Sequence, residues 1–338
     1  MIRNALLPVF VAIAFLFVAG CSREDASVVV LYTSVDQPVA QPIVDAFTRE
    51  TGIKVELRTD TEATKSVGLA ERLRAEKASP KADVWWGNEV FHTINLANEG
   101  VLQPYASQSP SAADVGLQFR DPDGRWASVG LRARVIVVTQ AVRPLRPWPE
   151  VKGLADLLDP NWRGQLAIAR PTAGTTGGHV AALYVLLGQE KADAFFRALH
   201  AQQVKLLGGN SVVADHVARG TVWAGLTDND DYAAALHEGG QLTSVLPDQD
   251  GFGTLTMPTT VGLVAGAPHA SAGKKLVDYL LSPQVEQKLL DAKFARYSVR
   301  DGVGERVKTM PVDYRKVAEV MPTAVRRATA LMEGRAVE

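Results

Sequence analysis

Apolar strands and amphipathic helices alternate along residues 28–98, and this rhythm restricts the fold more than any other feature of the chain. Val28 to Tyr32 is a continuous run rich in β-branched residues, and Asp36-Gln37-Pro38 then introduces a helix that ends at Gly52. A strand, a helix, a strand and a helix are expected next, at 53–57, 65–77, 82–89 and 91–98. This βαβαβ order predicts an α/β protein with a mostly parallel sheet and helices on both faces.

A second unit with the same rhythm follows at 153–207, which predicts two lobes. Long strand-like segments at 126–139 and 253–265 bracket this unit, so the chain is expected to cross to a second lobe and return. The chain has 338 residues, which is more than one hydrophobic core normally holds.

The N-terminal segment predicts export from the cytoplasm. Arg3 precedes an apolar stretch that is short for a membrane span, and the stretch ends in VAGC at the single cysteine, Cys21. VAGC resembles the bacterial lipoprotein box, which implies a signal peptide at 1–20, lipid on Cys21 and a tether at 21–27. The protein is thus expected to be a membrane-anchored periplasmic lipoprotein; the alternative is an ordinary signal peptide with an incidental cysteine.

Charge and cysteine content exclude several classes of protein. The chain carries 36 basic and 37 acidic residues without a basic tract, which argues against a nucleic-acid partner. No second apolar run suggests a membrane span. One cysteine allows no intramolecular disulfide.

The acidic run Asp228-Asn229-Asp230-Asp231-Tyr232 follows the apolar stretch 221–226, and it is the first candidate site. Carboxylates this close repel one another unless a cation, an amine or solvent neutralises them, and α/β sheets place ligands at strand C-termini. The alternative is a solvated turn in which Asp228 caps the next helix.

Several segments together resemble a known family. The order FTRETGIKV, KADVWWGNE, PNWRGQLAIARPTAGTTG, GNSVVADHVARGTVWAGLTDNDD and APHASAGKKLVDYLLSPQVEQ is similar to the periplasmic solute-binding proteins of iron(III)-family ABC importers. The resemblance extends from about Val28 to Leu290. It implies the two-lobed type II binding-protein fold, with 28–130 and 257–338 as lobe I, 131–256 as lobe II and the ligand in the cleft between them.

An anion subsite is expected where a loop enters a helix. Thr175, Thr176 and Gly177 stand at that point, where free N–H groups, hydroxyls and the helix dipole favour an anion. The resemblance adds Asn210 and Asn229 to this subsite and places Ser34 in the cleft. The alternative is that the glycines permit close helix packing and Thr175 caps the helix.

The expected metal ligands are carboxylates, and here the sequence departs from the family pattern. Ferric binders carry an adjacent tyrosine pair where this chain has Asp230 and Asp231. With Asp36 and Glu89, these residues offer an all-oxygen shell for iron(III) or another hard cation. Alternatively, the carboxylates hold the ammonium group of a zwitterionic ligand. Asp36 has a further alternative role, as the cap of the helix that follows it.

The predicted function is the substrate-binding component of an ABC importer. It captures iron(III), with phosphate or carbonate as the accompanying anion, and delivers it as a monomer to a permease and its ATPase. One alternative ligand is an aminophosphonate-like zwitterion or another small charged solute. A distant alternative is a secreted metal-dependent phosphoesterase, although no GxSxG motif supplies a nucleophile and the six histidines form no metal pattern. We therefore expect a binding protein that is not an enzyme and has no catalytic cofactor.

Three arginines and one histidine also lie near predicted cleft segments. Arg132, Arg134 and Arg170 flank the crossing strand or the anion loop, and Arg170 is a candidate for added charge at the anion subsite. A surface guanidinium is the alternative for each of them. His179 begins the helix at the anion loop, which makes it the one histidine with a candidate role at the site.

Overall fold

The computed structural model describes most of the chain after the N-terminal segment. The described residues are 27–60, 67–108, 114–141, 150–172, 174–300, 302–305 and 307–337. The predicted signal peptide, Cys21 and most of the 21–27 tether lie outside them. Within the described residues, every helix is too short or too polar to cross a bilayer.

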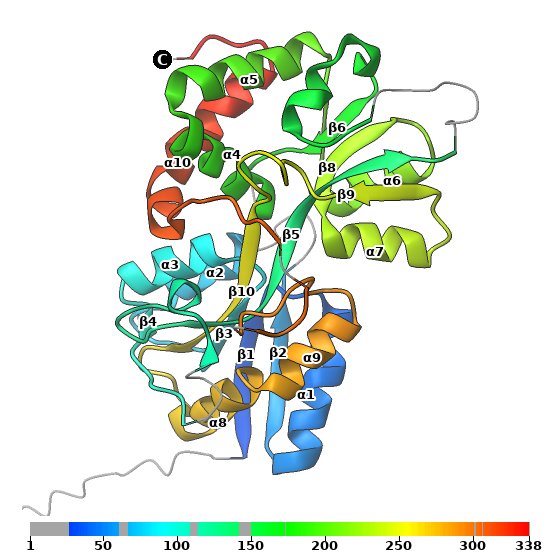
Figure 1. The fold of residues 1–338 in the computed structure, drawn as a ribbon. Helices are drawn as coiled ribbons and strands as arrows, with labels where there is room; N and C mark the ends of the chain where they lie inside the picture. The colour runs from blue at the N-terminus through cyan, green and yellow to red at the C-terminus, as the bar shows by residue number, and fades with distance from the viewer. Residues whose placement is uncertain are drawn as a thin grey trace, which may run out of the picture.

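The chain begins with the alternation that the sequence predicts. Its first elements are β1 (Val28–Thr33), α1 (Gln37–Thr51), β2 (Lys54–Thr59), α2 (Val67–Ala75), β3 (Val84–Gly87), α3 (Val90–Asn98) and β4 (Leu102–Gln103). Helix α1 buries one apolar stripe and ends at Gly52, which adopts the left-handed conformation with φ 73°. Together with α8 (Ala270–Leu280) and α9 (Pro283–Asp291), these elements make up the lower body in Figure 1.

The second body follows the long strand β5 (Ala127–Thr139). Its elements are β6 (Leu166–Ala169), α4 (Gly174–Leu187), α5 (Gln189–Ala201), β7 (Lys205–Leu207), α6 (Asn210–Ala218), β8 (Ala224–Asp228), α7 (Asn229–His237) and β9 (Leu242–Val245). Strand β10 (Thr256–Val264) then returns the chain to the lower body. Two long strands therefore connect the two bodies, as the bracketing segments predict (Figure 1).

The ten strands in the described part of the chain belong to one curled sheet, whose main order is β2-β1-β3-β10-β5-β8-β6-β7. The outer strands pair in parallel, β1 with β2 and β3, and β6 with β7 and β8. The two connecting strands pair antiparallel with each other and with their neighbours β3 and β8. The parallel pairing within each half and the flanking helices agree with the expected α/β class.

The last helix lies beside the second body. Helix α10 (Tyr314–Met332) packs on α4 and α5 and also contacts α3 of the lower body (Figure 1). This differs from the predicted boundary, which put every residue after 257 in lobe I. The apolar face of α10 includes Val317, Met321 and Leu331, all buried in a core shared with α3 and α4, and burying that face decides where the helix lies.

Candidate functional site

A cavity of about 1550 Å³ separates the two bodies on one side of the connecting strands. Asp36 and Pro38 at the start of α1 line its lower wall, and the segment after α9 adds Lys293 and Phe294. Helix α7 supplies the upper wall, including Asp230 and Asp231. The acidic run that the sequence singles out therefore faces a cleft of ligand size between the two bodies.

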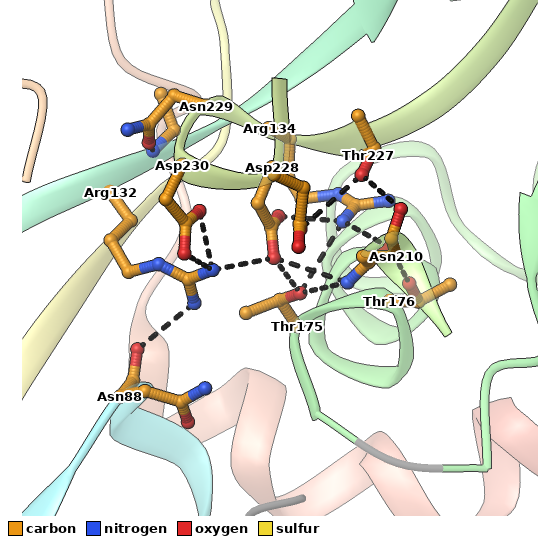
Figure 2. A network of polar contacts seen from close by, with 12 residues as sticks. Asn88, Arg132, Arg134, Thr175, Thr176, Asn210, Thr227, Asp228, Asn229 and Asp230 are labelled. Carbon is orange, nitrogen blue, oxygen red and sulfur yellow. Dashed lines mark hydrogen bonds and ion pairs between the residues drawn. The ribbon is translucent and has the colours of Figure 1, made fainter. Parts of the chain in front are cut away.

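The acidic run spans the end of β8 and the first turn of α7. Asp228 ends β8 and occupies the N-cap position, yet within the described residues its side chain makes no hydrogen bond to the N–H groups of α7. Its carboxylate turns instead toward two arginines of β5 (Figure 2). Asp228 therefore occupies the predicted N-cap position, but its side chain does not cap the helix as the alternative predicts.

Arg132 and Arg134 lie two residues apart on β5, so both side chains leave the same face of the strand. Arg132 Nη2 donates to Asp228 Oδ2 at 3.0 Å and to both oxygens of Asp230 at 2.6 Å. Arg134 Nη1 donates to Asp228 Oδ1 at 2.6 Å. These guanidiniums are 1% and 0% exposed, so the surface alternative for Arg132 and Arg134 is wrong.

Arg132 also contacts the opposite body. Its Nη1 donates to the backbone oxygen of Asn88 at 3.3 Å, and its guanidinium lies over the Phe294 ring, 5.1 Å from the centroid. Arg170, by contrast, is half exposed and forms an ion pair with Glu333 on the outer surface. One guanidinium thus joins the acidic run of the second body to the lower body.

Burial and the two arginines shift the pKa of Asp228 in opposite directions. Burial by itself raises the pKa of this carboxyl, whereas the charges of Arg134 and Arg132 and the hydrogen bond from Thr175 lower it below its ordinary value. Burial likewise lowers the pKa of Arg132, and Asp230, Asp228 and Asp231 raise it above its ordinary value. The buried groups are therefore held as a charged network.

The first turn of α4 joins this network. Thr175 Oγ1 donates to Asp228 Oδ2 at 2.5 Å, and Asn210 Nδ2 donates to the same oxygen at 3.1 Å. Thr176 Oγ1 donates to Asn210 Oδ1 at 3.0 Å, and Arg134 Nη1 donates to that oxygen at 3.1 Å. Figure 2 shows Arg134, Thr175 and Asn210 converging on Asp228 from β5, α4 and α6, with Thr176 beside Asn210 as a further partner of that amide.

Asn229 is the first residue of α7 and has other partners. Its Oδ1 accepts from the backbone N–H of Ala133 at 2.7 Å, and its Nδ2 donates to the carbonyls of Lys293 and Phe294 at 3.1 Å each. Lys293 adopts a left-handed conformation with φ 59°, which is uncommon for a residue other than glycine. The amide of Asn229 thus ties α7 to β5 and to the segment after α9.

Three other candidates have structural contacts. Ser34 Oγ donates to Asn88 Oδ1 at 3.0 Å and accepts from the Asn88 N–H at 2.9 Å. Glu89 is fully buried and caps α3 by accepting from the N–H of Phe91 at 2.6 Å and of His92 at 3.1 Å. A side chain at Gly177 would approach Met321 and the Pro171 carbonyl to 2.9 Å, so this glycine permits close packing.

Asp36, Asp230 and Asp231 are the metal candidates that line the cavity. Asp36 holds the N-cap position of α1 but, in the described part of the chain, accepts no hydrogen bond from the N–H groups of that helix. One oxygen from each of Asp228, Asp230 and Asp231 lies within 4.8 Å of the others. Such a group of carboxylates suits a hard cation, and Arg132 Nη2 supplies the positive charge beside two of them.

Comparisons with known proteins agree with this geometry. A family model described as bacterial extracellular solute-binding protein matches residues 28–294. Iron uptake protein A1 of Synechocystis sp. is 28% identical over 81% of this chain and 76% of that protein. The major ferric iron-binding protein of Neisseria meningitidis serogroup B is 26% identical, over 90% of this chain and 92% of that protein.

The same resemblance holds between structures. The solved structure of a Bordetella ferric binding protein matches with a TM-score of 0.71 and 27% identity. The match covers 90% of this chain and 98% of that one. It confirms the expected two-lobed type II fold.

Proposed function

The chain belongs to the bacterial extracellular solute-binding proteins, and from that premise we propose that it captures iron(III) for an ABC importer. The ligand is held in the cleft between the two lobes and passed to a membrane permease that its ATPase drives. Binding without turnover is the task of such a protein. Relatives named for ferric iron, in Neisseria and Bordetella, support the choice of ligand.

The observation that carries the proposal is the acidic lining of the cleft. Among the described residues, five carboxylates line the cavity, against two basic side chains and one histidine; the carboxylates are Asp36, Asp230, Asp231, Asp291 and Glu305, the basic residues are Lys293 and Arg296, and the histidine is His237. Iron(III) prefers anionic oxygen ligands, and an excess of carboxylates attracts cations electrostatically. The charge of this cleft is therefore complementary to a highly charged hard cation.

In this proposal Asp230 and Asp231 take the place of the tyrosine pair of the ferric binders, and Asp36 approaches from the opposite wall. Arg132 competes with the metal, because its Nη2 lies 2.6 Å from both oxygens of Asp230. A cation that binds Asp230 has to displace this bond. Closure of the lobes around the metal then changes the surface that the permease recognises.

The proposal places the protein in the periplasm, anchored through lipid on Cys21 and acting as a monomer. The support is the VAGC sequence at the end of the apolar N-terminal stretch, together with the family itself. Radiolabelled palmitate incorporated by the wild-type protein but not by Cys21→Ser tests the anchor.

The ligand is tested by metal binding to purified protein. Equilibrium dialysis against iron(III) citrate, followed by elemental analysis, is expected to show one iron per chain for the wild type. The double variant Asp230→Asn/Asp231→Asn removes two charged ligands without changing side-chain size, and we expect at least a tenfold loss of affinity, equivalent to about 1.4 kcal/mol. The matched control is Asp215→Asn, on the exposed surface of α6, which is expected to bind like the wild type.

Absence of iron binding to the wild type, together with saturable stabilisation by 2-aminoethylphosphonate, would replace iron with the zwitterionic ligand. Hydrolysis of a generic phosphoester by the pure protein, lost in the double variant, would instead assign it to the phosphoesterases.

A further inference from the structure

Two of the donors expected to hold a free anion, Thr175 and Asn210, bond instead to a side chain of the protein itself, and two arginines of β5 join them there. The Asp228 carboxylate accepts hydrogen bonds from Thr175 Oγ1, Asn210 Nδ2, Arg132 Nη2 and Arg134 Nη1, at 2.5, 3.1, 3.0 and 2.6 Å. Three of these bonds reach Oδ2 and one reaches Oδ1, so both oxygens of the carboxylate are engaged within the protein. Figure 2 shows Asp228 at the centre of this group.

The backbone holds Asp228 at this point. Asp228 is the last residue of β8 and pairs in register with Arg134 of β5. Strand β8 also pairs with β6, which leads into the chain before α4. The carboxylate and its donors are thus placed by the sheet and by the starts of two helices, and a group on such rigid elements is positioned precisely.

The two buried guanidiniums have carboxylate partners within the protein, and Asp231 adds a further negative charge close to Arg132. Arg132 and Arg134 carry two positive charges, and Asp228 and Asp230, which bond to them directly, carry two negative ones. Asp228 is 1% exposed, so its charge is stabilised by these partners and not by water. A free phosphate or carbonate at the start of α4 would meet the Asp228 carboxylate and lack its counter-charge.

We propose that Asp228 is a built-in anion that fills the subsite at the start of α4, in place of a free phosphate or carbonate. The cation of the cleft is then bound without an accompanying anion. The statement about the cation rests on the proposed function, whereas the statement about the anion subsite concerns the protein alone and is tested without metal.

The test removes the Asp228 carboxylate from the subsite and adds a free anion to the buffer. Asp228→Ala removes the carboxylate that Arg132 and Arg134 share, although Arg132 keeps its bond to Asp230, and formate is the smallest replacement for the missing group. In chloride buffer free of metal, formate is expected to raise the Tm of Asp228→Ala by several degrees with a saturable dependence. The wild type and the matched control Asp215→Ala are expected to show no saturable change with formate or phosphate.

Saturable stabilisation of the wild type by phosphate or carbonate would overturn the proposal, and so would an Asp228→Ala variant that folds but ignores every anion. If Asp228→Ala does not fold, Asp228→Asn and the wild type carry the test. Refolding yield of Asp228→Asn is expected to be below that of the wild type at every formate concentration, because an amide fills the space without supplying the charge. A yield equal to the wild type would contradict the proposal.

A last measurement separates this inference from the proposed function. The iron affinity of the wild type is expected to change less than twofold when phosphate or carbonate is added to anion-free buffer. A tenfold gain would overturn the built-in anion but leave iron transport intact. Absence of iron binding under all conditions would remove the proposed function, while formate rescue of Asp228→Ala would still support the built-in anion.

Discussion

The buried residue His179, near the start of α4, is held in its neutral form by its surroundings. His179 is 1% exposed, and neither ring nitrogen has a hydrogen-bond partner among the described residues. Burial, and then the positive charge of Arg134, lower the pKa of His179 to about 3, although Asp228 opposes the shift. The imidazole is therefore neutral in the folded protein across the physiological range.

This histidine predicts a specific loss of stability in mild acid. In the unfolded chain the His179 pKa returns to 6.5, so between that value and about 3 the unfolded state binds more protons. Its contribution to stability is complete above pH 6.5 and is lost as the pH falls toward 3. His179→Leu is expected to reduce the slope of unfolding free energy against pH by up to about 1.4 kcal/mol per pH unit.

Urea unfolding at several pH values across that window measures the slope. His237→Leu, at an exposed position on α7, is the control and is expected to keep the wild-type slope. If His179→Leu also keeps it, burial does not hold this histidine neutral.

At the scale of elements, the first turn of α4 packs against α3 of the other lobe. A Cβ built on Gly178 would lie 1.9 Å from Cε2 of Phe91, a distance that atoms cannot adopt. Phe91 is itself fully buried and contacts the Tyr314 ring of α10 edge-on. The glycine at this position is therefore required by the close approach of two helices, one from each lobe.

Gly178→Ala is expected to destabilise the protein by about 1–3 kcal/mol, because the added methyl group overpacks the contact between α3 and α4. Gly208→Ala is the matched control, since a Cβ there meets no atom within 4 Å. Chemical unfolding of both variants measures the difference. Equal free energies of unfolding for the two variants would show that α3 and α4 can move apart without loss of stability.

At the scale of the whole molecule, the two lobes meet differently on the two sides of β5 and β10. Figure 1 shows α3, α4 and α10 stacked along one side, where they share a hydrophobic core. On the other side, α1 and α9 face α7 across the cavity. This arrangement suits a hinge motion in which the packed side acts as the pivot and the cavity narrows around its ligand.

Ligand binding is therefore expected to make the protein more compact. Small-angle X-ray scattering is expected to show a smaller radius of gyration with saturating iron(III) citrate than without it. The free energy of unfolding is expected to rise by about 2.7 kcal/mol at a free ligand concentration about 100 times the Kd. The Asp230→Asn/Asp231→Asn variant serves as the control that keeps the ligand-free radius. An unchanged radius for iron-loaded wild type would rule out closure on the ligand.

Much of the architecture could be predicted from local pattern. The apolar run at 28–32 and the helix that begins after Asp36 agree with β1 and α1, and the segments at 126–139 and 253–265 agree with β5 and β10. The position of the acidic run after β8 was also predictable. These features depend on periodicity and on residues close in sequence, which a single chain reveals directly.

The hydrogen-bond partners of the site residues could not be predicted from the sequence to the same extent. Arg132 and Arg134 alternate within an otherwise apolar strand, a signal that two buried charges need partners, but it does not name Asp228. Glu89 caps α3, and Asn229 bonds to the segment after α9. The first detail depends on the direction of one side chain, and the second on a pair far apart in the sequence.

The order of strands and helices and the two-lobed α/β class were determined by the sequence alone, because hydrophobic periodicity is a local property. Only the tertiary structure decided that α10 joins the second lobe and that Asp228 receives the donors at the start of α4. Both outcomes follow from burial: an apolar helix face needs a core to cover it, and a buried carboxylate needs donors to offset its lost hydration.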